Sequence, residues 1–195
     1  AATHPRWGWT MFYYMLRNEG HVVNHKRIRR IYRASGLVLF RKRRRRFPPR
    51  ERTVLPATKV SDVWSVDFVH DALTDGRSVR VLTVIDDATR IALAATADHS
   101  LPAARVIREL AYLCEIHGPP RNIRSDNGPE FISAELQRWA RDRGINWHFI
   151  QPGKPAQNCF VERFNGTLRR DVLAATLFVT LSQMRQRLDE TRHIY

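Results

Sequence analysis

The sequence predicts an α/β core preceded by a small helical unit, and three observations lead to this prediction. From residue 63 onward, short runs with strand patterning alternate with runs of helical patterning. Before residue 50, two helix-patterned runs each end at a glycine. Residues 1–50 hold 14 lysines and arginines against one acid, Glu19, whereas residues 63–195 hold 17 basic and 16 acidic residues. This asymmetry indicates a polyanion-binding arm next to a nearly neutral core.

Composition narrows the class of protein. A length of 195 residues suits one ordinary domain plus a small second one. The chain has no apolar run near 18 residues and no signal-peptide pattern, so no transmembrane helix is expected. The two cysteines, Cys114 and Cys159, lack the C-x-x-C spacing and argue for a reducing cytosol, against a disulfide framework or a zinc knuckle.

The N-terminal region, residues 1–47, is expected to form a helix-turn-helix-like unit. Apolar residues at helical spacing predict a first helix within residues 6–19, with Gly20 as its stop. Asn24 is a candidate N-cap for a second helix, which Gly36 would end. The two helices would be joined by a tight turn.

Two groups of basic side chains in this region are candidate DNA contacts. One group lies on the second predicted helix, where the alternative is a solvated helix face; the near absence of acids favours DNA. The other forms an extended run ahead of a linker at residues 48–62, and should track phosphates. A nuclear-localisation signal is a non-specific alternative for that run. The candidates are Lys26, Arg27, Arg30 and Arg33 on the helix, and Arg41, Lys42, Arg43 and Arg44 in the run.

The core is expected at residues 63–195. Its segments follow from apolar alternation, capping residues and Pro/Gly punctuation. Strands are expected at 63–70, 79–86, 90–96, 121–125 and 145–150, with a hairpin turn at 71–78 around Asp75-Gly76; helices are expected at 102–117, 133–143 and from about 157, after a Pro/Gly loop at 151–155. Strands interleaved with helices around one mixed sheet predict the α/β class.

Three carboxylates are the candidate catalytic and metal-binding residues. Asp67 lies inside an apolar strand, where an aspartate is costly unless it is paired or bound to metal. Asp126 follows a short strand, and Glu162 lies in a helical run, with 35 residues between the two. Taken alone, Asp126 is also explained as a turn residue and Glu162 as a solvated helix residue. Together they predict a cluster that holds two Mg²⁺ ions for in-line phosphoryl transfer.

Other polar residues near these segments have weaker assignments. Asp86 and Asp87 follow a strand and are interpreted as its end, and Glu130 is too close to Asp126 to be the helix carboxylate. Four residues around the Glu162 helix are candidate DNA contacts, with a solvated or core-edge helix as the alternative. These are Lys154, Asn158, Asn165 and Arg169.

The motifs, in order, resemble a known family. They include Trp64-Ser65-Val66-Asp67-Phe68, the segment from Ser125 to Phe131, Pro152 to Asn158, and Glu162 to Arg169. The chain resembles the DDE transposases of bacterial insertion sequences, in particular the second-reading-frame product of the IS-three group, and more distantly the retroviral integrase cores. The resemblance implies an RNase H-like integrase catalytic core with a five-stranded mixed sheet behind a helix-turn-helix-like region.

The resemblance also implies an activity. A polynucleotidyl transferase of this kind would cut DNA at insertion-sequence ends and use the freed 3′ hydroxyl to attack another strand. It would use two Mg²⁺ ions, with Mn²⁺ possible, act on insertion-sequence ends and target DNA as a homo-oligomer, and reside in the bacterial cytoplasm near the nucleoid. Relatives continue beyond Tyr195, so the core is expected to be truncated at its C-terminus.

Two alternatives from other classes stay open at this point. One is a catalytically inactive DNA-binding remnant, or a regulator of transposition; the intact carboxylates favour the enzyme. The other is a nuclease acting on RNA–DNA hybrids, which the basic N-terminal region disfavours.

Overall fold

The computed structural model describes residues 7–37, 57, 59–151 and 155–195. The chain divides into two compact units, a small N-terminal helical unit and a larger unit that holds the sheet. Within the described ranges, no helix is long and apolar enough to cross a membrane.

The N-terminal unit holds the two predicted helices, α1 (Trp9–Asn18) and α2 (His25–Ala34). The Asn24 side chain accepts a hydrogen bond from the Lys26 backbone N–H at 2.8 Å, which confirms Asn24 as the N-cap. Gly20, in the turn between the helices, has φ of +86°, a left-handed conformation that glycine adopts without strain.

An aromatic cluster holds these two helices together. Tyr32 is the buried residue of α2, and its hydroxyl donates to the backbone carbonyl of Trp7 at 3.0 Å. The Phe12 ring lies between them, with its centre 5.6 Å from that of Trp7 and 6.1 Å from that of Tyr32. The cluster buries Trp7 and Tyr32, whereas the basic side chains of α2 are exposed.

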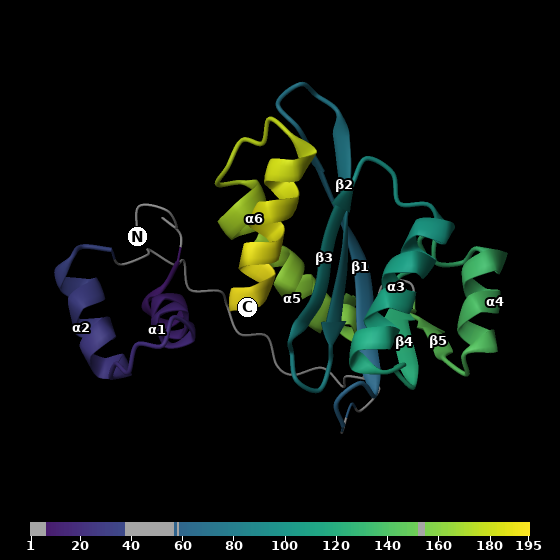
Figure 1. Cartoon of the computed structure of the whole chain (residues 1–195), viewed down its shortest axis with the longest axis horizontal. Helices are drawn as coiled ribbons and strands as arrows, with labels where there is room; N and C mark the ends of the chain where they lie inside the picture. The colour runs from purple at the N-terminus through teal and green to yellow at the C-terminus, as the bar shows by residue number, and fades with distance from the viewer. Residues whose placement is uncertain (1–6, 38–56, 58, 152–154) are drawn as a thin grey trace. The chain divides into compact units, whose positions relative to one another are not determined.

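The larger unit is built on the predicted five-stranded mixed sheet (Figure 1). The strands lie in the order β3-β2-β1-β4-β5, with β1, β2 and β3 antiparallel and β1, β4 and β5 parallel. Their bounds are β1 Val63–Ala72, β2 Ser78–Asp86, β3 Ala92–Asp98, β4 Asn122–Ser125 and β5 Asn146–Phe149. β1 is therefore the central strand.

The hairpin between β1 and β2 fixes their register. Ala72 pairs with Ser78, and the turn between them contains Gly76 at φ +85°. Counting back along both strands places Asp67 directly opposite Thr83. The turn is shorter than the predicted 71–78 segment, because β1 extends two residues beyond the predicted end at residue 70.

Helices cover both faces of the sheet (Figure 1). On one face, α3 (Ala103–His117) and α4 (Ala134–Asp142) pack on strand residues such as Trp64 and Val66. On the other face, α5 (Cys159–Leu168) and α6 (Leu181–Ile194) pack on strand residues such as Val69. Successive β1 side chains thus alternate between two separate apolar cores.

The segment after residue 155 differs from the single long helix that was expected. It begins as a 3-10 turn, Pro155–Asn158, continues as α5, and widens into a π-helical turn, Arg169–Leu173. The chain then turns back, and the buried Phe178 carbonyl accepts the Thr74 backbone N–H at 2.9 Å. α6 follows as a separate helix that the sequence analysis did not predict.

Candidate active site

Asp67 lies in the middle of β1, on the face that α5 covers. One carboxylate oxygen accepts the Phe68 backbone N–H at 2.8 Å, and the other accepts the Asn165 side-chain amide at 2.8 Å. The pKa of Asp67 is raised to about 6, first by burial and also by the nearby charges of Asp126 and Glu162, while the two hydrogen bonds act to lower it. Asp67 is therefore a half-buried acid whose ionised form is disfavoured in the metal-free protein.

Asn165 ties α5 to the two central strands at the level of Asp67. Its amide nitrogen donates to Asp67, while its amide oxygen lies 2.8 Å from the hydroxyl of the buried Thr83. The same hydroxyl lies 3.1 Å from the Asp67 backbone carbonyl. The Thr83 hydroxyl orients the Asn165 amide so that its nitrogen faces the carboxylate, which fixes the rotamer of Asp67.

Asp126 directly follows β4, the parallel neighbour of β1. The pairing of β1 with β4 ends where Ser65 pairs with Arg124, so Asp67 and Asp126 each lie two residues beyond the last paired position. The Asp126 carboxylate accepts the Gly128 backbone N–H at 3.1 Å. A Cβ atom at Gly128 would lie 3.1 Å from that carboxylate oxygen, so a larger residue there would require the Asp126 side chain to shift.

Glu162 lies in the first turn of α5 on its exposed side. Its neighbours Val161 and Phe164 are buried against the sheet and fix the rotation of the helix. Glu162 precedes Asn165 by three residues, a distance of about 4.5 Å along the axis and on an adjacent face. Partial burial raises the pKa of Glu162.

The three carboxylates are near one another but not gathered at ligand distance. The charges of Asp126 and Glu162 both act on Asp67, which places all three in one electrostatic neighbourhood. In the arrangement described, no three acidic, histidine or cysteine side chains of residues 7–37, 59–151 and 155–195 form a group that could hold a metal ion. The Asp126 turn and the Glu162 side chain would have to move inward to complete such a site.

The local chemistry fits a hard divalent cation. In the described part of the chain, both hydrogen-bond donors to Asp67 are neutral groups, a backbone amide and the Asn165 amide. A half-buried carboxylate near two others, held by neutral donors, is the arrangement that a cation stabilises. Carboxylate oxygens are also the ligands that Mg²⁺ and Mn²⁺ prefer.

The other acids near the site have structural roles, in line with their interpretation above. Asp86 ends β2 by accepting the backbone N–H groups of Ala88 and Ser61 at 2.8 and 2.7 Å. Asp87 is buried, accepts the Ser65 hydroxyl at 2.6 Å and pairs with Arg124.

The predicted DNA contacts fall in different environments, and contact with DNA stays a prediction for all of them. On α2, the four basic residues Lys26, Arg27, Arg30 and Arg33 are exposed, as is Arg169 in the π-helical turn. Asn158 is 2% exposed and donates to the Val66 carbonyl at 3.4 Å, so in this structure it holds α5 against β1. Asn165 is engaged with Asp67. The remaining candidates, Arg41, Lys42, Arg43, Arg44 and Lys154, lie outside the described residues.

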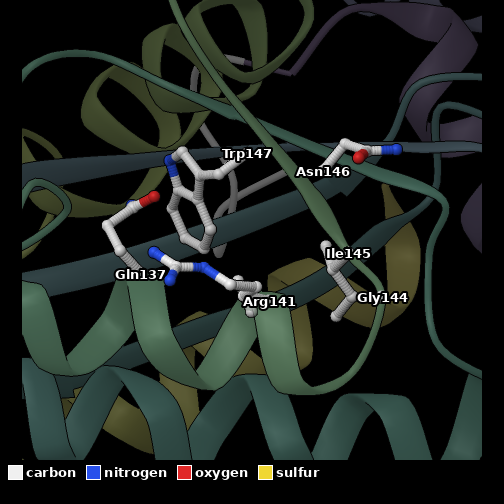
Figure 2. A pocket seen from close by; sticks show the side chains of 7 residues that line it. Gln137, Arg141, Gly144, Ile145, Asn146 and Trp147 are labelled. Atoms are coloured by element: carbon white, nitrogen blue, oxygen red, sulfur yellow. The ribbon is translucent and has the colours of Figure 1, made fainter.

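A polar pocket of about 260 Å³ lies along α4 and β5 (Figure 2). Figure 2 shows the side chains of Gln137 and Arg141 beside the Trp147 ring. The Trp147 indole N–H donates to the Ser125 hydroxyl at 2.9 Å, immediately before Asp126. None of the residues that line the pocket is acidic, so the three carboxylates are not part of it. The pocket is connected to the candidate site only through the hydrogen bond from Trp147 to Ser125.

Three residues that matter to this geometry were missed in the sequence. Thr83 could have been found from the hairpin, because the Asp75-Gly76 turn sets which residue faces Asp67. Gly128 follows Asp126 in a turn motif, but its close approach to the carboxylate has no sequence signal beyond the glycine itself. Arg80 pairs with Glu130, fifty positions away, and no local pattern predicts that pair.

Comparison with family models identifies both units. Residues 57–155 match the model described as "Integrase core domain", and residues 143–195 match a second model of the same description. Residues 1–46 match the model described as "HTH-like domain". The integrase core match of residues 57–155 includes two of the three carboxylates, and the second match includes Glu162.

Two curated relatives match along the whole chain. The uncharacterized 31.7 kDa protein of insertion element IS407 from Burkholderia multivorans is 40% identical, over 100% of this chain and 71% of its own length. The uncharacterized 39.2 kDa protein of insertion element IS476 from Xanthomonas euvesicatoria is 39% identical, over 100% of this chain and 57% of its own length. The chain therefore spans part of each relative.

The fold also resembles a solved structure. The catalytic core domain of HTLV-2 integrase, in complex with magnesium and in trimeric form, superposes with a TM-score of 0.55 at 18% identity. The match covers 68% of this chain and 85% of that domain. At this identity the likeness establishes the fold, and it confirms the predicted integrase-type core.

Proposed function

The chain belongs to the integrase core domain family, and from this membership we propose that it is a transposase. The proposed reaction is metal-dependent cleavage of DNA at insertion-element ends, followed by strand transfer into target DNA. The substrate class follows from the two relatives, which are both insertion-element proteins.

The observation that carries this proposal is the placement of Asp67, Asp126 and Glu162. Asp67 lies in β1, Asp126 directly follows the neighbouring strand β4, and Glu162 lies in the first turn of α5. The charges of Asp126 and Glu162 both act on Asp67 across more than 55 residues of sequence. Three carboxylates that influence one another supply the kind of ligands that a two-cation phosphoryl-transfer site needs, and this supports the proposal.

The proposed roles of the residues follow from their environments. Asp67, whose rotamer Asn165 fixes, would hold the cations together with Asp126 and Glu162. Bound Mg²⁺ or Mn²⁺ would supply Lewis-acid stabilisation of the phosphate and of the attacking and leaving oxygens. Asn165 and Thr83 would keep the Asp67 carboxylate in its orientation during turnover.

The exposed basic face of α2 would bind DNA phosphates. Its four basic residues lie in the part of the chain that matches the HTH-like domain. Because the HTLV-2 integrase core is described in trimeric form, and because strand transfer requires paired DNA ends, we propose that this chain is also active as an oligomer.

The test is cleavage and joining of labelled insertion-element end DNA in Mg²⁺ or Mn²⁺. Asp67→Asn, Asp126→Asn and Glu162→Gln should each abolish both products and retain DNA binding. Matched controls are Asp71→Asn, further along β1, and Glu135→Gln, which like Glu162 lies in the first turn of a core helix. Both controls should keep wild-type activity.

Two outcomes would contradict the proposal. Full activity in any of the three carboxylate variants would reject the assignment of that residue. DNA binding without products in the wild type, across both metals, would favour the inactive DNA-binding protein or a fragment that needs the rest of its longer relatives.

A further inference from the structure

Glu130 is a fourth carboxylate close to the candidate active site. It lies four residues after Asp126, in the same turn. A Cβ atom built on Gly128 would lie 3.1 Å from an Asp126 oxygen and 3.6 Å from a Glu130 oxygen, so both acids border one small space. Both acids therefore lie in the turn that follows β4.

Arg80 of β2 holds Glu130 in this position. The Arg80 guanidinium forms an ion pair with the Glu130 carboxylate, and the central carbon (Cζ) of the guanidinium lies 4.2 Å from the centre of the Phe68 ring. The Phe131 ring stacks on Phe68 at 4.9 Å with an interplanar angle of 15°. Two consecutive residues of the turn, Glu130 and Phe131, therefore contact β1 and β2 through Arg80 and Phe68.

This ion pair is more protected from solvent than an ordinary surface pair. The side chains of Arg80 and Glu130 are 23% and 16% exposed. In the same hairpin, Arg77 and Asp75 form a pair at 2.7 Å whose side chains are 62% and 45% exposed. Partial burial strengthens the first pair, whereas solvent screens the second.

The anchor acts on the turn that carries Asp126. The turn is closed by backbone hydrogen bonds from Phe131 and Ile132 to the Gly128 carbonyl, at 2.9 and 3.1 Å. Since the turn is internally bonded, fixing its far end at Glu130 also limits where Asp126, at its near end, can move.

We propose that Arg80 is a positioning residue for Asp126, because its pair with Glu130 over Phe68 anchors the turn that carries Asp126. This rests on the proposed function, in which Asp126 is a metal ligand. Arg80 touches neither Asp126 nor the reacting groups, and acts through the turn.

Charge and position predict opposite effects of removing Arg80. A guanidinium near a cation site repels the cation, so its charge alone predicts tighter metal binding in Arg80→Gln. Loss of the anchor predicts weaker binding, by about tenfold, the usual effect of losing a group that orients a metal ligand. The sign of the change therefore separates the two explanations.

The experiment measures Mn²⁺ binding by the free protein through its thermal stabilisation, without DNA. Wild type, Arg80→Gln, Arg80→Lys, Glu130→Gln, Asp126→Asn and the matched control Arg77→Gln are titrated in parallel. Arg80→Gln should need about tenfold more Mn²⁺ than wild type, and Arg77→Gln should match wild type. Arg80→Lys keeps the charge pair, so the Mn²⁺ concentration that it needs should lie between those of wild type and Arg80→Gln. It replaces Arg80→Gln in the comparison if that variant does not fold.

A second readout is strand joining at increasing Mn²⁺. Raising the metal concentration should restore Arg80→Gln and leave Asp126→Asn inactive. Suppose that the wild type responds to Mn²⁺ and Asp126→Asn does not. Tighter or unchanged Mn²⁺ binding in Arg80→Gln would then overturn the role of Arg80 and leave the metal site standing. Absence of any Mn²⁺ response in the wild type would overturn the metal site, and the role of Arg80 with it.

Discussion

At the scale of single residues, Asp67 shows a conflict between stability and metal binding. The fold buries half of its carboxyl group and places two further acids near it, so the pKa of Asp67 rises from 3.8 to about 6. A cation would reverse this effect by favouring the ionised form. The same carboxylate thus destabilises the metal-free protein near neutral pH and would stabilise the metal-bound protein.

The first prediction is that Asp67→Asn stabilises the metal-free protein in a pH-dependent way. The folded state binds more protons than the unfolded state between about pH 4 and 6, so wild-type stability relative to the variant falls as pH rises through this window. Above it, the variant should be more stable by about 1–3 kcal/mol. Urea unfolding in EDTA at pH 4 to 7.5 measures the difference.

Asp71→Asn is the matched control for this prediction. Asp71 lies on the same strand and accepts the N–H of the following residue at 2.9 Å, as Asp67 does at 2.8 Å. It lacks the Asn165 contact. A stability difference between Asp67→Asn and wild type that is constant from pH 4 to 7.5 would reject burial and neighbouring charge as the cause.

The carboxylates themselves could be predicted from the sequence, whereas their support could not. An aspartate inside an apolar strand, and a turn aspartate separated from a helix glutamate by 35 residues, are patterns that the sequence shows directly. The hydrogen bond from Asn165 to Asp67 joins residues 98 positions apart. Asn158 and Asn165 look alike in the sequence, but packing buries the first under α5 and aims the second at the acid.

At the scale of elements, the pairing of β1 with β4 sets where the segment that carries Asp126 begins relative to Asp67. A buried group of three residues fixes the last position of that pairing, where Ser65 pairs with Arg124. Asp87 accepts the Ser65 hydroxyl and pairs with Arg124, so it joins both strands. Burial raises the pKa of Asp87 against these two interactions, which both favour its ionised form.

The second prediction is a strong energetic coupling between Asp87 and Arg124. Removing one partner leaves the other charge buried and unpaired, so Asp87→Ala or Arg124→Met should each cost about 3–5 kcal/mol. The double variant should cost much less than the sum of the two, because it buries no unpaired charge. Urea unfolding of all four proteins gives the coupling energy, and additive losses would show that the pair contributes no mutual stabilisation.

Element prediction worked best where local signals agree. Asn24 was correctly predicted as an N-cap, and the Asp75-Gly76 hairpin was correctly located, because capping and turn geometry are local. Residues 155–173 form three successive helical types, a change that no local pattern predicted, and the buried Asp171 in the last of them pairs with Arg170. α6 was missed because its stability comes from packing Met184 and Leu188 on the distant sheet.

At the scale of the whole molecule, the division of charge coincides with the division of family matches. The HTH-like match covers residues 1–46, and the integrase core matches begin at residue 57. Residues 1–50 contain 14 of the 33 basic residues and one of the 19 acids, whereas residues 63–195 are nearly neutral. The proposed function follows the same division, with general DNA affinity in the basic unit and chemistry in the nearly neutral one.

The third prediction concerns the salt dependence of DNA binding. Each phosphate contact adds about 0.9 to the slope of log affinity against log salt. Changing Lys26, Arg27, Arg30 and Arg33 to glutamine should weaken binding and lower the slope by about 2–4, and removing residues 1–50 should lower it further.

The matched control for charge changes four exposed arginines of the core together to glutamine: Arg108, Arg121, Arg138 and Arg141. Fluorescence anisotropy of labelled duplex DNA measures the DNA affinity of the wild type and the three variants at salt concentrations from about 50 to about 300 mM. If the four arginines of the core lower the slope as much as the four residues of α2, the effect is one of net charge, and the N-terminal unit is not the principal DNA anchor.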